Sequence, residues 1–268
     1  MSDSIYDLIA QDAQSLKLEL TSESAASLAL RKSWTDDQVK AVRTAFAFVR
    51  EQKRQKAVAT LLRLSRLPLK EPKTFENFDF GQLKGDHMDA LKELPQLTPL
   101  YAHRNLALIG PQGVGKTHLA MAFGRACCEA GYKAYFLKAT QLNEKFRDAL
   151  KQGKEKSTVN GLVKPSCLII DEVGRCVFDK TETRMFFDVI DRRYNKEGPN
   201  TTILTSNLEP SMWGEFFSED SSLLCTLDRI FDTATVFLIK GESYRGKHCK
   251  TVTMTASQPL SLPGSKTE

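Results

Sequence analysis

Long hydrophobic runs are absent from this sequence of 268 residues. No stretch approaches the roughly 18 consecutive apolar residues that a membrane-spanning helix needs. The first residues, MSDSIYDLIAQDAQ, also lack the basic and then apolar order of a secretory signal peptide. The sequence therefore predicts a cytoplasmic protein with no membrane partner.

Cysteine and histidine are too few and too scattered to form a recognisable metal site. The six cysteines contain no CxxC pair, and the four histidines stand in unrelated segments. Reduced thiols packed in the interior are the expected state, with a metal site as the minor alternative. A hydrophobic content of 41% is ample for a packed core.

Acidic residues are nearly missing between residues 40 and 73. Ten lysines and arginines in this stretch are opposed only by Glu51 and Glu71, although the net charge of the whole chain is just +5. A phosphate backbone is one natural partner for such a local excess of positive charge. A solvated helix face is the alternative that charge alone leaves open.

Three regions differ in composition. Residues 1–68 are polar and basic and predict a helical N-terminal domain, residues 69–248 predict the main domain, and the Ser/Thr/Pro-containing residues 249–268 predict a disordered tail. In the first region, Thr35 to Gln38 have the spacing of a capping box. An amphipathic basic helix is expected to start there, because apolar residues recur near helical period at Val39, Val42, Phe46 and Val49.

Residues 105–206 alternate between strand and helix patterns. Apolar strands are expected at 106–109, 133–137, 166–171 and 201–206, and helices at 117–130, 140–152 and 181–194, the last with Thr181 as a candidate cap. Strands that alternate with helices predict an α/β fold, in which a parallel sheet is sandwiched by helices.

The run GPQGVGKT, residues 110–117, matches G-x-x-x-x-G-K-[ST] and lies between an expected strand and an expected helix. Glycines let backbone N–H groups approach phosphates, Lys116 carries the charge for the β- and γ-phosphates, and the Thr117 hydroxyl is a ligand for Mg²⁺. We therefore predict ATP and Mg²⁺ as cofactors. The expected nucleotide contacts are Gly110, Pro111, Gln112, Gly113, Val114, Gly115, Lys116, Thr117 and His118, together with Asp171.

An apolar strand ending in a carboxylate should supply the second half of such a site, and CLIIDE ends in Asp171 and Glu172. Asp171 is expected to hold Mg²⁺, and Glu172 to polarise the water that attacks the γ-phosphate. Asn207 follows the next strand, where it would either orient that water or cap the following helix. The acid pair beside a phosphate loop favours ATP hydrolysis over phosphoryl transfer to a small acceptor.

The segments GPQGVGKT, CLIIDE, ILTSN, DRI and GESYR, in this order, resemble the AAA+ ATPases of the DnaC/IstB clade, and LTSNLEPSMWGEFF looks most like the IstB transposition-helper ATPases. The resemblance covers about residues 50–248 and implies an AAA+ P-loop core. By position it implies a Walker A motif with Lys116 and Thr117, a Walker B motif with Asp171 and Glu172, sensor 1 at Asn207, an arginine finger at Arg229 that acts on a neighbouring subunit's nucleotide, and sensor 2 at Arg245.

The resemblance also implies a function and partners. The expected protein is a bacterial, ATP-hydrolysing helper of DNA transposition that forms a homo-oligomer, ring or filament, on duplex DNA and recruits or stimulates the transposase of the same mobile element. It gives the basic stretch more weight as a DNA-contacting element. The candidate DNA contacts are Arg50, Lys53, Arg54, Lys56, Arg63 and Arg66.

Three other functions stay open at this point. A replicative helicase loader of the DnaC type would share the ATP site but bind a helicase and single-stranded DNA. A small-molecule kinase would need an arginine-rich lid and an acceptor pocket, neither of which the sequence reveals. A structural protein that binds ATP without hydrolysing it would have no use for Glu172 beside Asp171.

Overall fold

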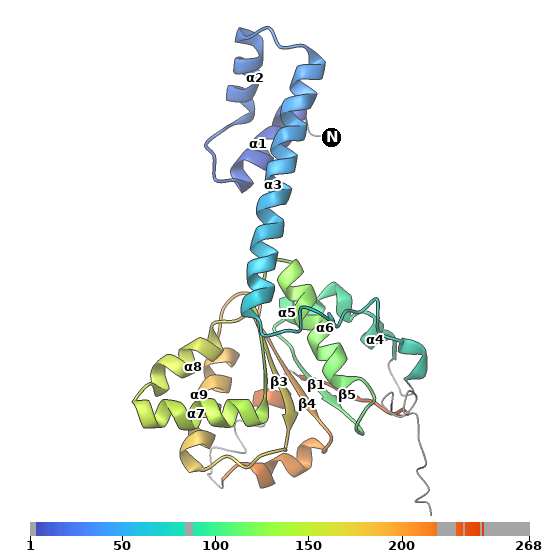
Figure 1. Cartoon of the computed structure of the whole chain (residues 1–268), viewed down its shortest axis with the longest axis vertical. Helices are drawn as coiled ribbons and strands as arrows, with labels where there is room; N and C mark the ends of the chain where they lie inside the picture. The colour runs from blue at the N-terminus through green and yellow to red at the C-terminus, as the bar shows by residue number, and fades with distance from the viewer. Residues whose placement is uncertain (1–3, 84–87, 219–228, 233, 242, 244–268) are drawn as a thin grey trace, which may run out of the picture.

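A five-stranded parallel sheet forms the centre of the computed structural model, which describes residues 4–83, 88–218, 229–232, 234–241 and 243. The strands lie side by side in the order β2-β3-β4-β1-β5 (Figure 1). Their bounds are Asn105–Ile109 for β1, Ala134–Lys138 for β2, Cys167–Val173 for β3, Thr201–Ser206 for β4 and Ala234–Leu238 for β5. The expected α/β fold with a parallel sheet is confirmed.

Helices cover both faces of the sheet, because alternate residues of each buried strand point to opposite sides. On one face Leu168 and Ile170 of β3 pack against α7 (Ala139–Gln152), α8 (Glu155–Val163) and α9 (Lys180–Tyr194). On the other face Ile169 packs with α6 (Lys116–Glu129) and the segments before β1. Each face thus has its own apolar cluster, and the central strands β3, β4 and β1 between them are buried on both sides.

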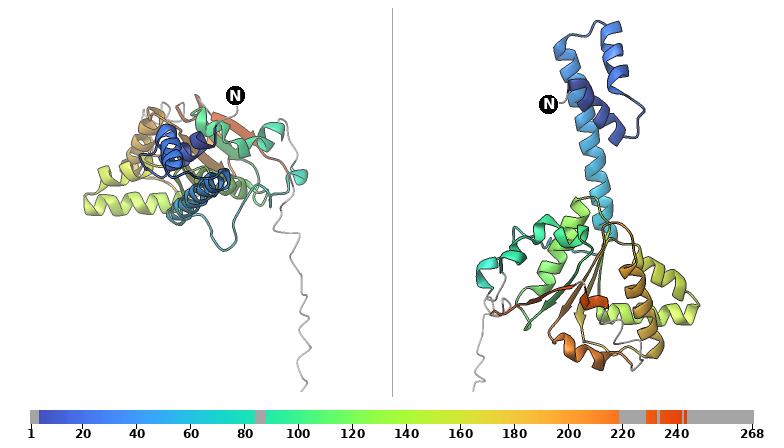
Figure 2. Two further views of the ribbon diagram at one scale, coloured as in Figure 1. Left: turned by 90° about the horizontal axis from the view of Figure 1, so that it is seen from above. Right: turned by 180° about the vertical axis from the view of Figure 1, so that it is seen from behind.

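Three helices precede this core. They are α1 (Ile5–Ser15), α2 (Ser22–Arg31) and α3 (Asp36–Leu64), and α3 stands away from the sheet with α1 and α2 beside its far end (Figures 1 and 2). The expected capping box at the start of α3 is present: the Gln38 N–H donates to Thr35 Oγ1 over 3.3 Å, and the Thr35 N–H donates to Gln38 Oε1 over 2.9 Å.

The apolar stripe of α3 is covered only near its start. Val39 is buried, Val42 and Phe46 are partly buried, and Val49 is 50% exposed. Residues 52–57 are all exposed, and six successive positions at 100° per residue point to every side of a helix. This part of α3 therefore has no covered face among the described residues.

The end of α3 is fastened to the edge of the sheet. The Phe136 N–H on strand β2 donates to Ser65 O over 2.8 Å, and Leu67 is buried in the apolar cluster under α6. The chain then crosses to β1 through an irregular connector and short helices. These are η1 (Phe80–Gln82), α4 (Met88–Lys92), η2 (Leu94–Gln96) and α5 (Thr98–Tyr101), and a further one, η3 (Pro210–Phe216), follows β4.

One local expectation is wrong, and one helix of the core was missed. The cap of α9 is Asp179, whose Oδ1 accepts the N–H groups of Thr181 and Glu182, so Thr181 lies inside the first turn. Helix α8 was not expected from the sequence, because EKSTVNGLV contains a glycine and buries only Val159 and Leu162. No helix in the described part of the chain is long and apolar enough to cross a membrane.

Candidate nucleotide-binding site

The loop between β1 and α6 is shaped by glycines that no other residue could replace. A Cβ on Gly110 would lie 2.1 Å from Ile239 O, and one on Gly115, at φ +96°, would lie 2.6 Å from the Phe78 ring. Gly115 is also the N-cap of α6, and no side chain within the described chain caps this helix. The first turn of α6 therefore offers its N–H groups and positive dipole end to an anion.

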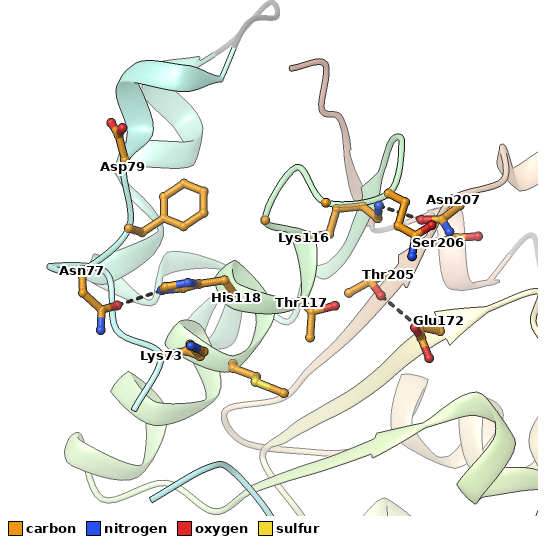
Figure 3. Close-up of a pocket in the computed structure, with 15 residues that line it drawn as sticks. Lys73, Asn77, Asp79, Lys116, Thr117, His118, Glu172, Thr205, Ser206 and Asn207 are labelled. Carbon is orange, nitrogen blue, oxygen red and sulfur yellow. Dashed lines mark hydrogen bonds between the residues drawn. The ribbon is translucent and has the colours of Figure 1, made fainter. Parts of the chain in front are cut away.

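Lys116 begins α6 and extends back across the loop, where it is only 7% exposed. Its Nζ donates to Gly110 O and Pro111 O, both over 2.7 Å, and to Asn207 Oδ1 over 2.8 Å (Figure 3). Asn207 does not cap the following helix, because η3 begins at Pro210 with Glu209 as its N-cap. The amide of Asn207 instead reaches the phosphate loop from β4, the strand next to β1.

Asp171, which is 1% exposed near the end of β3, forms the centre of a small oxygen cluster. Its Oδ1 accepts the hydroxyl of Thr117 over 2.7 Å and that of Thr205 over 2.6 Å. Carboxylate and hydroxyl oxygens are the ligands that Mg²⁺ prefers. The cluster adjoins the N-terminal end of α6, which suits a phosphate. The residues present therefore fit Mg²⁺ and a nucleotide phosphate together.

Glu172 adopts a left-handed backbone conformation, with φ 61°, where β3 departs from its register with β4. Its N–H donates to Thr205 Oγ1 over 3.0 Å, while its carboxylate pairs with Lys138 Nζ at 3.1 Å and with the Arg175 guanidinium. Partial burial acts to raise the pKa of Glu172, but the two cations outweigh it and leave the pKa below its ordinary value. The carboxylate is thus kept ionised.

A cavity of about 480 Å³ lies over the phosphate loop, and the connector before β1 forms its opposite wall. His118 Nε2 lies 2.9 Å from Asn77 Oδ1 (Figure 3) and 2.9 Å from Thr74 O. Phe78 meets the His118 ring edge to face, with the ring centres 5.1 Å apart. Burial, aided by the charge of Lys73, lowers the pKa of His118, although its contact with Thr74 O acts in the opposite direction. The neutral imidazole is therefore favoured.

The remaining members of the expected site are distributed unevenly. Gln112 lines the cavity, whereas Val114 is fully buried and packs into the apolar cluster under α6. Arg229 lies at the amino ends of the strands, beside Asn105 at the start of β1, whereas the phosphate loop lies at their carboxyl ends. Its guanidinium pairs with Asp191 of α9. Arg245 and the tail at 249–268 lie outside the described residues.

The six candidate DNA contacts are also in different environments. Arg50 pairs with the buried Asp12, and Lys53 Nζ donates to Leu16 O over 3.0 Å, so both fasten α1 to α3. Arg54 pairs with Glu51 on its own helix at 2.8 Å. The other three are Lys56 and Arg63, which are exposed, and Arg66, whose guanidinium lies 5.5 Å from the centre of the Tyr135 ring.

The sequence reasoning did not identify Lys138 and Arg175 as neighbours of Glu172. A basic residue at the end of β2 and another three positions after Glu172 were the available signals. The parallel pairing of β2 with β3, which places Lys138 opposite Asp171, was needed to bring them together.

Comparison with known proteins agrees with this geometry. Residues 12–252 match the family model of the IstB-like ATP-binding proteins. The chain is 37% identical over 194 residues to the putative ATP-binding protein of insertion sequence IS5376 from Geobacillus stearothermophilus, which covers 72% of this chain and 75% of that protein. It is 32% identical over 234 residues to the putative ATP-binding protein of insertion sequence IS21 from Pseudomonas aeruginosa, with 87% and 80% covered.

Solved structures share the fold. A crystal structure of the DnaC helicase loader superposes with a TM-score of 0.51 at 19% identity, over 63% of this chain and 97% of that one. This likeness identifies the core as an AAA+ P-loop fold, as the sequence motifs implied.

Proposed function

Because this chain belongs to the IstB-like ATP-binding protein family, we propose that it is an ATP-hydrolysing helper of DNA transposition. In this function its subunits assemble with ATP at their interfaces, bind duplex DNA, and recruit or stimulate the transposase of the same mobile element. ATP hydrolysis then resets the assembly. The observation that carries the proposal is that Lys116 and Thr117, just after β1, lie close to Asp171 and Glu172 at the carboxyl end of β3, with only β4 between the two strands.

The proposed hydrolysis follows from the positions of these side chains. Lys116 leaves the loop carbonyls for the β- and γ-phosphates, and Thr117 and Asp171 would hold Mg²⁺, which neutralises charge on the phosphate oxygens. Glu172 accepts a proton from water as the water oxygen bonds to the γ-phosphorus. Asn207 positions this water from the β4 side before the attack. As the new bond forms, the bond from the γ-phosphorus to the β,γ-bridging oxygen breaks.

Arg229 supports assembly as part of the cycle. It lies at the amino ends of the strands, whereas the phosphate loop lies at their carboxyl ends, so it is not placed to reach the nucleotide of its own subunit. A cation that stabilises the γ-phosphate can come from a neighbouring chain. We therefore assign Arg229 to the nucleotide of the next subunit, and Arg245 to the sensor 2 position that the family pattern implies.

Duplex DNA is the proposed polymer partner, because the solvent-exposed part of α3 carries several cations. Lys56 and Arg63 are exposed there and face solvent without covering an apolar core. Contacts from such cations go to phosphates and carry little sequence information. A DnaC-like helicase loader is the alternative function, and its partners would be a helicase and single-stranded DNA.

Substitution of the proposed arginine finger tests this function. We expect Arg229→Ala to bind ATP normally but to hydrolyse it about 10³-fold more slowly, and to form fewer oligomers on duplex DNA. Arg31→Ala, which removes an exposed arginine of α2, is the matched control. Turnover, fluorescent-nucleotide binding and light scattering would be measured on each.

Normal turnover by Arg229→Ala would overturn the role of this residue. In a pull-down with this protein as bait, capture of a replicative helicase without capture of the transposase would favour the helicase-loader function. Formation of a phosphorylated nucleoside or nucleotide would instead favour a kinase.

A further inference from the structure

The acid pair of the site lies in an irregularity of the sheet. Strand β3 loses its register with β4 after Ile170 and regains it at Val173. Within this interval two residues of β3, Asp171 and Glu172, stand opposite one residue of β4, Thr205. This count of two residues against one is that of a β-bulge, which re-aims side chains next to active sites. The bulge therefore brings both acids to a single residue of the neighbouring strand.

Thr205 contacts both acids with one hydroxyl group. Its Oγ1 donates to Asp171 Oδ1 over 2.6 Å and accepts the Glu172 N–H over 3.0 Å (Figure 3). A hydroxyl group has one hydrogen to donate and lone pairs that accept, so one side chain can serve both acids at once. Thr205 is 1% exposed, so these two bonds are formed away from solvent.

Each of the two bonds fixes a different part of the site. The bond to Asp171 adds to the one from the Thr117 hydroxyl and sets the orientation of a buried carboxylate. The bond from the Glu172 N–H holds a backbone with φ 61°, a left-handed conformation that few residues other than glycine adopt and that persists only where the surroundings hold it. A change in that conformation would aim the Glu172 side chain in another direction.

We propose that Thr205 is a positioning residue for ATP hydrolysis, whose hydroxyl group fixes both the Asp171 carboxylate that would hold Mg²⁺ and the backbone of Glu172. The inference rests on the proposed ATPase function and adds a residue outside the phosphate loop, the acid pair and Asn207. Thr205 acts through the two acids, and the β-bulge is what lets one side chain reach them both.

The rigidity of Thr205 suits this role. A β-branched side chain has restricted χ1 freedom, so its hydroxyl group is held in place at little further cost in entropy. Thr201 at the start of the same strand is also buried, and its hydroxyl donates to Arg104 O over 2.7 Å. Thr201 is thus a matched control, because it has similar burial and a similar bond at the opposite end of β4 from the acids.

Substitution by valine removes the hydroxyl group and keeps the branched shape. We expect Thr205→Val to lower kcat for ATP by about 10²-fold, the size of effect that a small misplacement of a catalytic group produces. KM for ATP should change by less than about threefold, because the groups that bind the phosphates at the start of α6 remain. The Mg²⁺ concentration for half-maximal rate should rise about tenfold or more, since Asp171 loses a bond that orients it.

Rescue by serine separates the hydroxyl group from the shape of the side chain. Thr205→Ser retains a donor and an acceptor, so we expect it to keep at least about a fifth of the wild-type kcat and the wild-type Mg²⁺ dependence. Thr201→Val should match the wild type in both. A loss in Thr201→Val as large as that in Thr205→Val, or a normal kcat in Thr205→Val, would overturn the proposal.

Metal binding gives a readout that does not require hydrolysis. Mn²⁺ would replace Mg²⁺ as the probe, and electron paramagnetic resonance would measure its binding to the full chain with ADP present. Thr205→Val should bind Mn²⁺ about tenfold or more weakly than the wild type, and Thr201→Val should not differ from it. Thr205→Ala, which lacks the hydroxyl group and brings no new methyl group toward Asp171, should show the same loss.

Hydrogen exchange tests the geometry on the wild type itself. The Glu172 N–H donates to a buried oxygen, so it should exchange as slowly as the amides in the middle of β3. Fast exchange at Glu172 would contradict the proposal even where Thr205→Val does not fold.

These measurements also separate the possible failures. Absence of ATP hydrolysis by the wild type, with Mg²⁺ and duplex DNA present, would refute the proposed ATPase function, and Mn²⁺ binding would still decide the role of Thr205 at Asp171. Wild-type hydrolysis together with unchanged Mn²⁺ affinity and unchanged kcat in Thr205→Val would refute only the positioning role.

Discussion

The three N-terminal helices and the sheet-centred core differ in how much interior they possess. The buried cluster of the N-terminal helices consists of Ile9, Ala25, Ala29 and Val39, and two of these are alanines. The core instead has an extensive apolar cluster on each face of its sheet. Local stability follows buried apolar contact, so the helices should open at a lower free energy than the core.

This difference corresponds to the two tasks that we propose. Phosphoryl transfer needs side chains held within a fraction of an ångström, and Asp171 obtains this from a strand buried on both faces. Contacts with a DNA backbone depend mainly on the number of cations and on salt. An exposed helix with little interior is sufficient for that task.

The largest effect on stability is expected from a substitution that creates a new cavity in the core. Phe123 of α6 is fully buried, and Phe123→Ala should reduce the free energy of unfolding of the core by about 3–5 kcal/mol. The two tryptophans report the two parts separately, because Trp34 packs on the N-terminal cluster and Trp213 lies in a core cluster. Urea unfolding followed by fluorescence of single-tryptophan variants would measure each transition.

The expected outcome is a shift of the Trp213 transition, with the Trp34 transition at lower urea and almost unchanged. Met121→Ala is the control on the same helix, since this side chain is only partly buried and lines the cavity over the phosphate loop. Equal shifts of both transitions would mean that the two parts unfold as one unit, and the comparison would fail.

Local signals account for what the sequence predicted correctly. The capping box at Thr35, the phosphate loop ending in Lys116 and Thr117, and the apolar strand before Asp171 each depend on a short stretch of chain. The pairing of Lys138 with Glu172 depends on which strands are neighbours, and the pairing of Arg50 with Asp12 depends on how helices pack. Such contacts between distant residues leave no periodic pattern in the sequence.

A smaller effect is expected from Arg50, which the sequence assigned to DNA but which pairs with the buried Asp12. The Asp12 side chain is 3% exposed, so Arg50→Gln leaves an ionised group in the interior without its cation. Because Arg50 itself is half exposed, we expect a loss of about 2 kcal/mol in the Trp34 transition, below the full cost of breaking a buried pair. The Trp213 transition should not move.

The double variant Asp12→Asn/Arg50→Gln provides the control. It removes the unpaired charge, so it should regain part of the stability that Arg50→Gln loses. Loss of duplex affinity by Arg50→Gln without any loss of stability would return this residue to the DNA-contacting set.

The smallest effect is expected from Lys56, and it should be on DNA alone. Lys56 is exposed in the part of α3 that no described segment covers, so Lys56→Gln should leave both unfolding transitions unchanged. Loss of one phosphate contact near 0.15 M salt should weaken duplex binding roughly fivefold and make the salt dependence less steep by about one unit. Lys32→Gln, at the end of α2 and outside the basic stretch, is the matched control for titrations at several salt concentrations. Equal affinities of the two variants would place the DNA on another surface, and the exposed part of α3 would then be a spacer between the N-terminal helices and the core.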